Sequence, residues 1–282
     1  MTFLQAMLLA VLQGFSELFP ISSLGHTVLV PALLHWHIDR SAPTFLAFVV
    51  ALHLGTAVAL VVFYRRDWAG IVRGLAASIA RGRIGTDGEE RIAWLLVFGT
   101  IPVAVLGVFL ERPVRALFGS IPLVAGFLIV NAAIMFAGER LRSAVRSGPP
   151  RRLASLPWSG AVWVGLGQSL ALFPGISRSG SSIVAGLLLG LTHEDAARYS
   201  FLLATPAIGA ASVLELPRLL DPSAQGVLAE AAIGGVLAGV TAYASVAFLT
   251  RYFRSNDLRP FGWYCLVAGA GALALAAAKM IA

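Results

Sequence analysis

Two polar clusters interrupt otherwise apolar stretches of this sequence, and their residue types could do chemistry on an anion. The first cluster comprises Gln13, Glu17, Ser22, Ser23 and His26, and the second comprises Ser177, Arg178, Ser179, Ser181 and Ser182. A carboxylate, an imidazole and hydroxyls can move protons or attack an electrophile, whereas a guanidinium holds a phosphate. Burying such groups among apolar residues is costly, so these positions are functional candidates.

The second cluster follows a helix break at Pro174-Gly175, which predicts a new helix from about Ser179. Its free backbone N–H groups, with Arg178 beside them, would form an anion site that suits phosphate best. Two other interpretations stay open. Arg178 could form only a structural pair with Glu17, or the serines could be small residues that allow close helix packing.

The first cluster lies around a second break, at Phe19-Pro20. Gln13 and Glu17 are four residues apart and share one face of a helix. If the two clusters face one another, Glu17 and His26 meet Arg178, and His26 is then predicted to act in catalysis. An isolated histidine in a membrane protein is more often a satisfied core residue. His53, midway along another apolar stretch, is predicted to be an interhelical hydrogen bonder.

Composition defines the class of protein. Apolar residues make up 58% of the 282 residues, charged residues only 12%, and the mean hydropathy is +0.83. These values exclude a soluble globular enzyme, a disordered chain and a coiled coil, and they indicate a polytopic helical membrane protein. The net charge of +7 comes from arginines between apolar segments, so no nucleic-acid partner is expected. The single cysteine, Cys265, excludes a disulfide within one chain.

Apolar runs predict an all-α fold with six transmembrane helices. They cover residues 44–64, 92–110, 121–138, 197–216, 227–250 and 260–281. Stretches 3–35 and 157–191 are apolar but broken, and each half is too short to cross a ~30 Å hydrocarbon core. We therefore expect two re-entrant helix–loop–helix segments, which are tolerated only inside protein or along a wet cavity.

The two broken stretches resemble copies of one another. Leu12-Gln13-Gly14 through Phe19-Pro20 matches Gly167-Gln168-Ser169 through Phe173-Pro174, at an offset of about 154 residues. Three predicted spans follow each copy, and an odd number of spans inverts the second copy. This is an inverted repeat, with the site expected near the midplane where the broken helices meet. We expect one integral membrane domain over 1–282, with repeat one at about 1–138 and repeat two at about 157–282.

Charge predicts the topology. With both breaks re-entrant, the loops on one side carry 15 lysines and arginines, against 5 on the other side. The positive-inside rule puts the richer side in the cytoplasm and both termini outside it. The first re-entrant segment then opens outward and the second opens inward.

Both clusters lie within longer signatures. Gln13, Glu17 and residues 18–26 resemble the first signature of the undecaprenyl-diphosphate phosphatases, the bacitracin-resistance family. Residues 174–182 resemble the second signature, and residues 201–206 resemble the stretch that follows it. The resemblance covers nearly the whole chain. Gln13 stands where the first signature allows Glu or Gln, and Ser182 stands where the second signature ends in Thr.

The resemblance implies hydrolysis of a polyprenyl diphosphate to the monophosphate and inorganic phosphate, with Mg²⁺ or Ca²⁺ as cofactor. This reaction recycles the lipid carrier of bacterial cell-wall synthesis and confers bacitracin resistance. The protein would lie in the bacterial inner membrane, with its active site facing the periplasm. Glu17, together with Gln13, would hold the metal ion. The phosphate would be bound by Ser22, Ser177, Arg178, Ser179 and Ser182.

The nucleophile has three candidate forms. His26 attacks directly, or Ser23 attacks with His26 as its base, or His26 or Glu17 activates a water molecule. Direct attack by water is the weakest of the three.

A rival function is a polyprenyl-phosphate flippase, because inverted repeats with broken helices are also transporter architecture. A flippase would need the anion site but not His26 beside Ser23 and Glu17. Membrane lipids are expected partners, since apolar helix faces can hold the polyprenyl tail. A homodimer is a further possibility, although the small residues Gly234, Gly235 and Gly239 fit packing within one chain equally well.

Overall fold

Helices account for almost all regular structure in the computed structural model, which describes residues 1–39, 42–85, 88–145, 149–220 and 226–281. The α-helices are α1 (Phe3–Ser16), α2 (Ser23–Leu33), α3 (Pro43–Phe63), α4 (Arg65–Arg81), α5 (Gly88–Arg115), α6 (Ile121–Val145), α7 (Trp158–Ser169), α8 (Arg178–Leu188), α9 (His193–Leu220), α10 (Leu228–Tyr252) and α11 (Arg259–Ala277). Within those ranges the extended structure is a single bridge between Arg151 and Leu191. The prediction of an all-α polytopic membrane protein is confirmed.

Five of the described helices are long and apolar enough to cross a membrane, namely α3, α5, α6, α10 and α11. They coincide with five of the six predicted spans. The remaining predicted span, 197–216, lies in α9, and part of its side chains falls outside the described residues.

The stretch 65–91 is not only a loop, as its charges suggested. It contains α4, a helix of 17 residues that packs on α5 through a buried face of Gly70, Ile71, Gly74 and Ser78. The helix ends at Gly82, whose φ of 63° is left-handed. The apolar face of this helix is narrow, and arginines lie on the opposite face. The hydropathy averaged over the segment is therefore too low to indicate a helix.

Both broken stretches form pairs of short helices, as predicted. The helices α1, α2, α7 and α8 have 14, 11, 12 and 11 residues, which is about 16–21 Å at 1.5 Å per residue. The second break depends on Gly175, whose φ is 114°. A Cβ there would collide with the Val124 carbonyl of α6, so only glycine fits.

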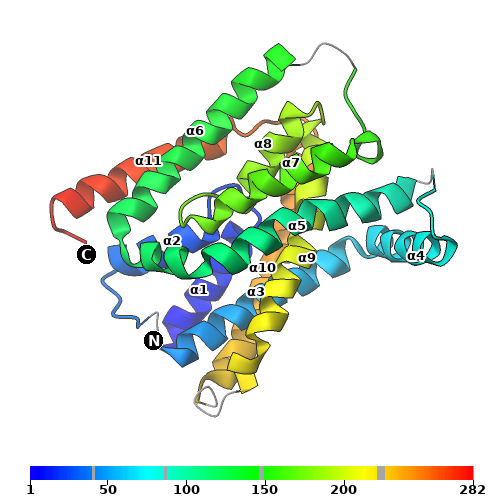
Figure 1. Ribbon diagram of the computed structural model, residues 1–282. Helices are drawn as coiled ribbons and strands as arrows, with labels where there is room; N and C mark the ends of the chain where they lie inside the picture. The colour runs from blue at the N-terminus through cyan, green and yellow to red at the C-terminus, as the bar shows by residue number, and fades with distance from the viewer. Residues whose placement is uncertain (40–41, 86–87, 146–148, 221–225, 282) are drawn as a thin grey trace.

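The helices pack in a recurring pattern (Figure 1). The α1 helix contacts α10 and α7 contacts α5, while α3 lies against α9 and α10, and α6 lies against α11. Gly55 of α3 meets Gly235 and Gly239 of α10 so closely that a Cβ on Gly55 would overlap the Gly235 carbonyl. The glycines of α10 therefore serve packing within the chain. The beginning of α1 and the end of α11 lie on one side of the molecule, away from α4.

Candidate active site

The two helix breaks contact one another in the protein interior. The Ser179 hydroxyl of the second break donates a hydrogen bond to the Phe19 carbonyl of the first, at 3.1 Å. Gly25 and Gly175 approach so closely that a Cβ on Gly25 would lie 3.2 Å from the Gly175 Cα. Side chains 150 or more positions apart along the chain are thereby placed around one point.

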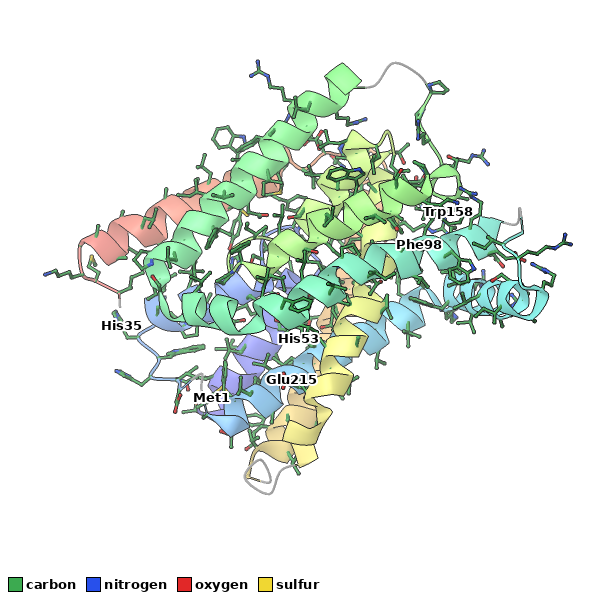
Figure 2. The ribbon with its side chains drawn as sticks, in the orientation of Figure 1. Met1, His35, His53, Phe98, Trp158 and Glu215 are labelled. Atoms are coloured by element: carbon green, nitrogen blue, oxygen red, sulfur yellow. The ribbon has the colours of Figure 1, made fainter. Side chains whose placement is uncertain are left out.

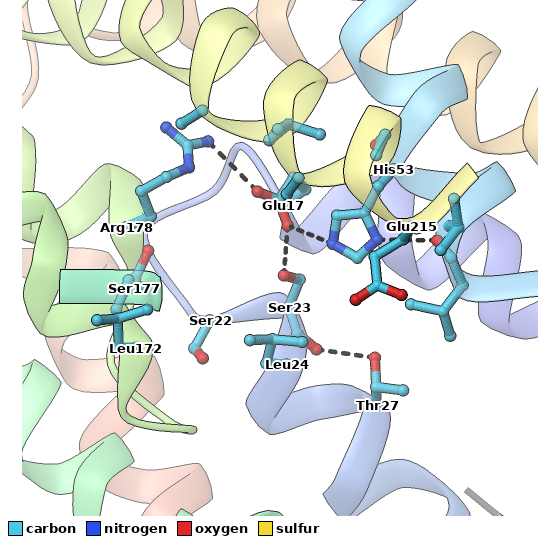
Figure 3. Close-up of a pocket in the computed structure, with 18 of the residues that line it drawn as sticks. Glu17, Ser22, Ser23, Leu24, Thr27, His53, Leu172, Ser177, Arg178 and Glu215 are labelled. Carbon is cyan, nitrogen blue, oxygen red and sulfur yellow. Dashed lines mark hydrogen bonds and ion pairs between the residues drawn. The ribbon is translucent and has the colours of Figure 1, made fainter. Parts of the chain in front are cut away.

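Glu17, the C-cap residue of α1, is the centre of the cluster (Figure 3). Its Oε2 accepts hydrogen bonds from the Ser23 hydroxyl at 2.5 Å and from the Gln13 amide at 3.1 Å. Its Oε1 faces Arg178 Nη2 at 3.4 Å. The carboxylate is buried, with 9% of its surface exposed. A buried carboxylate next to a hydroxyl is a base for that hydroxyl, and a nearby guanidinium holds the carboxylate in its charged form.

Arg178 is the first residue of α8, and its guanidinium is only loosely engaged. Nη1 donates to the Ser200 carbonyl at 3.3 Å, and Nη2 lies 3.4 Å from Glu17. Charge-assisted bonds of this kind are usually ~2.7–2.9 Å. Among the described groups, Arg178 Nε is buried with no hydrogen-bond partner. The guanidinium therefore has donors available for a phosphate in addition to its contact with Glu17, which favours the anion site over a purely structural pair.

These groups line a cavity of about 790 Å³, a size typical of sites for small organic ligands. Glu17, Ser22, Ser23, Ser177 and Arg178 lie on its wall. The rest of the wall is mainly apolar, and its larger side chains are Leu24, Val28, Phe45, Leu46, Val49, Val50, Val103, Leu172, Ile176 and Ile208. A charged head with a long hydrocarbon tail matches this distribution.

His53 and Glu215 also line the cavity, and they lie close to one another (Figures 2 and 3). The Nδ1 atom of His53 bonds the Val49 carbonyl of its own helix at 2.9 Å, and Nε2 lies 3.8 Å from Glu17 Oε2. The hydrogen bond at Nδ1 is therefore within α3, and an interhelical hydrogen bond of this ring stays a prediction. His53 faces the site, and its contact across helices is with the central carboxylate.

His26 lies elsewhere. Its Nδ1 contacts the Ser22 carbonyl at 2.7 Å, and its Nε2 contacts the Tyr264 hydroxyl of α11, also at 2.7 Å. The two rings are stacked with centroids 5.6 Å apart. Glu17 meets Arg178 as predicted, but both nitrogens of His26 are occupied by other groups. The imidazole is therefore not the group that accepts the Ser23 proton in this arrangement.

The serines divide into two groups. Ser22 and Ser177 lie on the cavity wall and cap α2 and α8, each accepting a bond from the backbone N–H three residues on at 3.2 Å. The Ser182 hydroxyl lies 2.7 Å from both the Arg178 carbonyl and the Ser200 hydroxyl, within hydrogen-bond distance of each. The hydroxyls of Ser179 and Ser182 therefore both form hydrogen bonds within the protein. A phosphate contact remains a prediction for these four residues. It is geometrically simplest for Ser22, because the Ser177 hydroxyl also contacts the Ser179 hydroxyl at 3.0 Å and the Phe19 carbonyl at 3.5 Å.

The divalent ion that the resemblance implies would require ligands, and few are present among the described residues. In the described part of the chain no three His, Cys, Asp or Glu side chains converge in a way that could hold a metal ion. Glu17 and the adjacent Gln13 amide offer one carboxylate and one carbonyl oxygen. This sparse set fits Mg²⁺, which usually takes its remaining ligands from phosphate and water.

Two residues of this region were not singled out from the sequence. Glu215 is a carboxylate inside the predicted span 197–216, and Asn131 is a buried amide inside the span 121–138. The general cost of placing polar side chains within a span is the signal that could have found both.

The fold and the site define a class of protein: a polytopic helical membrane protein with a buried carboxylate, hydroxyl and guanidinium on the wall of a largely apolar cavity. Comparison with known proteins identifies the family. The sequence profile of the family described as bacitracin resistance protein BacA matches residues 6–271, and the chain belongs to this family.

Relatives of known name align over almost the whole chain. An undecaprenyl-diphosphatase of Acidiphilium cryptum is 48% identical over 281 residues, which is 98% of each chain. Undecaprenyl-diphosphatase 2 of Chromobacterium violaceum is 46% identical over 95% of this chain and 97% of its own. An undecaprenyl-diphosphatase of Mycobacterium avium is 45% identical over 97% of each chain.

Proposed function

We propose that this protein is an enzyme that hydrolyses undecaprenyl diphosphate to undecaprenyl monophosphate and inorganic phosphate. The observation that carries this proposal is the placement of Ser23, Glu17 and Arg178, from two distant helix breaks, on the wall of one apolar cavity. The names of relatives that align end to end with the chain support the substrate.

Ser23 is the nucleophile in this proposal. Its oxygen attacks the terminal phosphorus, its proton passes to Glu17, and the bond from that phosphorus to the bridging oxygen breaks. The monophosphate lipid leaves with the bridging oxygen. Water then attacks the phosphoserine, releasing inorganic phosphate and restoring the Ser23 hydroxyl. The 2.5 Å bond from Ser23 to Glu17 supports this assignment over attack by His26.

Arg178 stabilises the charge that develops on the equatorial oxygens of the transferred phosphoryl group. Its unpartnered Nε and the loose contact of Nη2 with Glu17 leave donors for those oxygens. Ser177 caps α8 beside it and lines the same wall. Glu17 and Gln13 would hold the divalent ion, which would neutralise negative charge on the diphosphate when bound.

The finer architecture belongs to the same proposal: six spans, two re-entrant segments and an inverted repeat. Two short helices followed by three long ones occur twice, with α4 as an insertion in the first half. A two-fold relation between the halves exchanges α1 with α7 and α10 with α5. The packing of α1 on α10 and of α7 on α5 agrees with that exchange, as do the pairs α3 with α9 and α6 with α11.

The bias of 15 to 5 basic residues supports periplasmic termini in a bacterial inner membrane, with the first break open to the periplasm. The beginning of α1 and the end of α11 share one side of the molecule, which agrees with this topology. Cysteine accessibility labelling at positions 2 and 84 in cells would test it, because the two sites should react from opposite faces. Membrane lipids surround the spans in this proposal, and a homodimer would need a surface other than the glycines of α10.

The flippase alternative lacks a specific observation in its favour. Moving a lipid phosphate needs the anion site, but it does not need a hydroxyl bonded to a buried carboxylate at that site.

Release of inorganic phosphate is the test. The purified protein in mild detergent is supplied with undecaprenyl diphosphate and Mg²⁺, and parallel samples contain a chelator or Ca²⁺. We expect release that depends on the metal ion and that is lost in Ser23→Ala and Arg178→Ala. A folded wild-type protein that releases no phosphate with either ion would refute the hydrolase, and lipid transfer in liposomes would then test the flippase.

A further inference from the structure

Asn131, on α6, bonds to both helix breaks at once. Its Nδ2 donates to the Pro20 carbonyl of the first break at 3.0 Å, and its Oδ1 accepts from the Ser177 backbone N–H of the second at 3.0 Å. The residue has no exposed surface. Nδ2 also lies 3.4 Å from the Cys265 sulfur of α11.

The two backbone groups that Asn131 bonds lie outside the hydrogen-bond pattern of the helices. Pro20 lies between α1 and α2, and Ser177 is the N-cap residue of α8, so neither group has a partner in a regular helix. An unpaired backbone group in a water-free interior is costly. A carboxamide carries an NH2 donor group and a carbonyl acceptor on one rigid plane, so it can bond one carbonyl and one N–H at the same time.

The groups held by Asn131 lie within three residues of the proposed reacting groups in the chain. Ser177 precedes Arg178, and Pro20 lies between Glu17 and Ser23 in the chain. Gly180, in the first turn of α8, passes so near the amide that a Cβ there would lie 3.4 Å from Asn131 Oδ1. Asn131 therefore contacts both breaks next to the site, in addition to the direct bond from Ser179 to Phe19.

We propose that Asn131 is a positioning residue, which fixes the first break against the second so that Arg178 meets the phosphate attacked by Ser23. This proposal rests on the proposed phosphatase function. The direct bond from Ser179 to Phe19 holds the breaks together, whereas Asn131 holds both against the rigid α6 helix. Loss of the amide would leave the substrate bound and the reacting groups misplaced.

Enzyme kinetics distinguish positioning from a structural role. In Asn131→Leu, which keeps the branched shape and the number of heavy atoms of the side chain, we expect kcat to fall about 10- to 100-fold, as misplacement of reacting groups by ~1 Å can do. KM should change much less, because the cavity wall is intact. Asn131→Asp keeps the acceptor for Ser177 and should retain more activity than the leucine variant.

The matched control is Tyr64→Phe, which removes another interhelical hydrogen bond, to Thr250 at 3.3 Å, far along α3 from the breaks. Both variants should lose thermal stability, but only Asn131→Leu should lose kcat. The double variant Asn131→Leu with Arg178→Ala should be hardly slower than Arg178→Ala alone. Equal losses of kcat in Asn131→Leu and Tyr64→Phe, or full additivity in the double variant, would overturn the proposal.

A measurement without substrate separates this proposal from the phosphatase function. Spin labels at Leu24 and Leu172, one on each side of the cavity, report the distance between the breaks in a Cys265→Ser background. Asn131→Leu should broaden or shift that distance distribution. An unchanged distribution refutes the positioning role even if hydrolysis is confirmed. A changed one supports that role even if the wild-type protein releases no phosphate.

Discussion

The two helix breaks have similar sequences, but their polar side chains differ in whether they face the cavity or bond within the protein. In the first break, Glu17 and Ser23 direct their polar atoms at one another and at the cavity. In the second, Ser179 and Ser182 use their hydroxyls to hold backbone and neighbouring helices, and Arg178 is the group that reaches the site. In the proposed mechanism, one copy of the repeated motif supplies the nucleophile and the base. The other copy supplies one cation, and its remaining polar groups hold the surrounding helices in place.

Substitution of Ser23 should have the largest effect on activity and tests whether the first break supplies the nucleophile. Ser23→Ala should lower phosphate release by at least about 10³-fold, because loss of a nucleophile removes the covalent step. Terminally labelled undecaprenyl diphosphate should also leave acid-stable phosphoserine on the wild-type protein and none on the variant. The control is Thr27→Ala, a cavity hydroxyl one turn further along α2. A Ser23→Ala protein as active as Thr27→Ala would contradict the assignment of the nucleophile to the first break.

In the proposed mechanism, Arg178 is the charged residue through which the second break acts on the substrate. Arg178→Ala should lower kcat about 10²- to 10³-fold, the usual cost of removing a donor that stabilises transition-state charge. Arg178→Lys should recover only part of this, because an ammonium cannot replace the fork of donors. Arg254→Ala, which removes an exposed pair with Glu194, is the control. Steady-state kinetics in detergent measure all three, and unaltered kcat in Arg178→Ala would show that the second break is structural throughout.

His26 belongs to the first break but is expected to act as support for it. His26→Phe and Tyr264→Phe each break the same 2.7 Å contact between α2 and α11. Both should reduce kcat to a similar extent, by roughly 3- to 10-fold, which is far less than loss of a general base. A much larger loss in His26→Phe than in Tyr264→Phe would restore a direct catalytic role to the imidazole.

The serines of the second break should affect stability more than rate. Ser182→Ala removes the hydrogen bond to Ser200 and should lower the free energy of unfolding by roughly 0.5–1.5 kcal/mol. Its kcat should stay within about threefold of the wild type, since no transition-state contact is lost. Thermal unfolding in detergent with parallel kinetics measures both quantities, and Ser155→Ala, at an exposed hydroxyl, is the reference. A large fall in kcat at full stability would return Ser182 to the phosphate site.

Much of the fold was predictable because its signals are local. Pro20 and Pro174-Gly175 cannot continue a helix, so the two breaks could be placed from sequence, and five predicted spans coincide with helices. The α4 helix was missed, because its arginines mask a narrow apolar face. The contact of Glu17 with Arg178 was predicted on the condition that the two breaks face one another, and they do.

The roles of the two histidines could not be predicted in the same way. His26 lies beside Ser22 and Ser23 in the chain, but its ring reaches α11, whereas His53 comes from a separate span and faces Glu17. Sequence proximity does not determine side-chain direction where a helix begins in a break.

Hydropathy, proline geometry and the cost of burying charge act locally, so the class of protein, the positions of the breaks and the chemical types at the site could be predicted from the sequence. Helix packing sets which side chains face the cavity and which serine hydroxyls bond within the protein, and it places Asn131 where it joins both breaks to α6. Those outcomes depend on contacts between different helices, some of them more than 100 positions apart in the chain, and the direction of a side chain across such a contact is set by how whole helices pack.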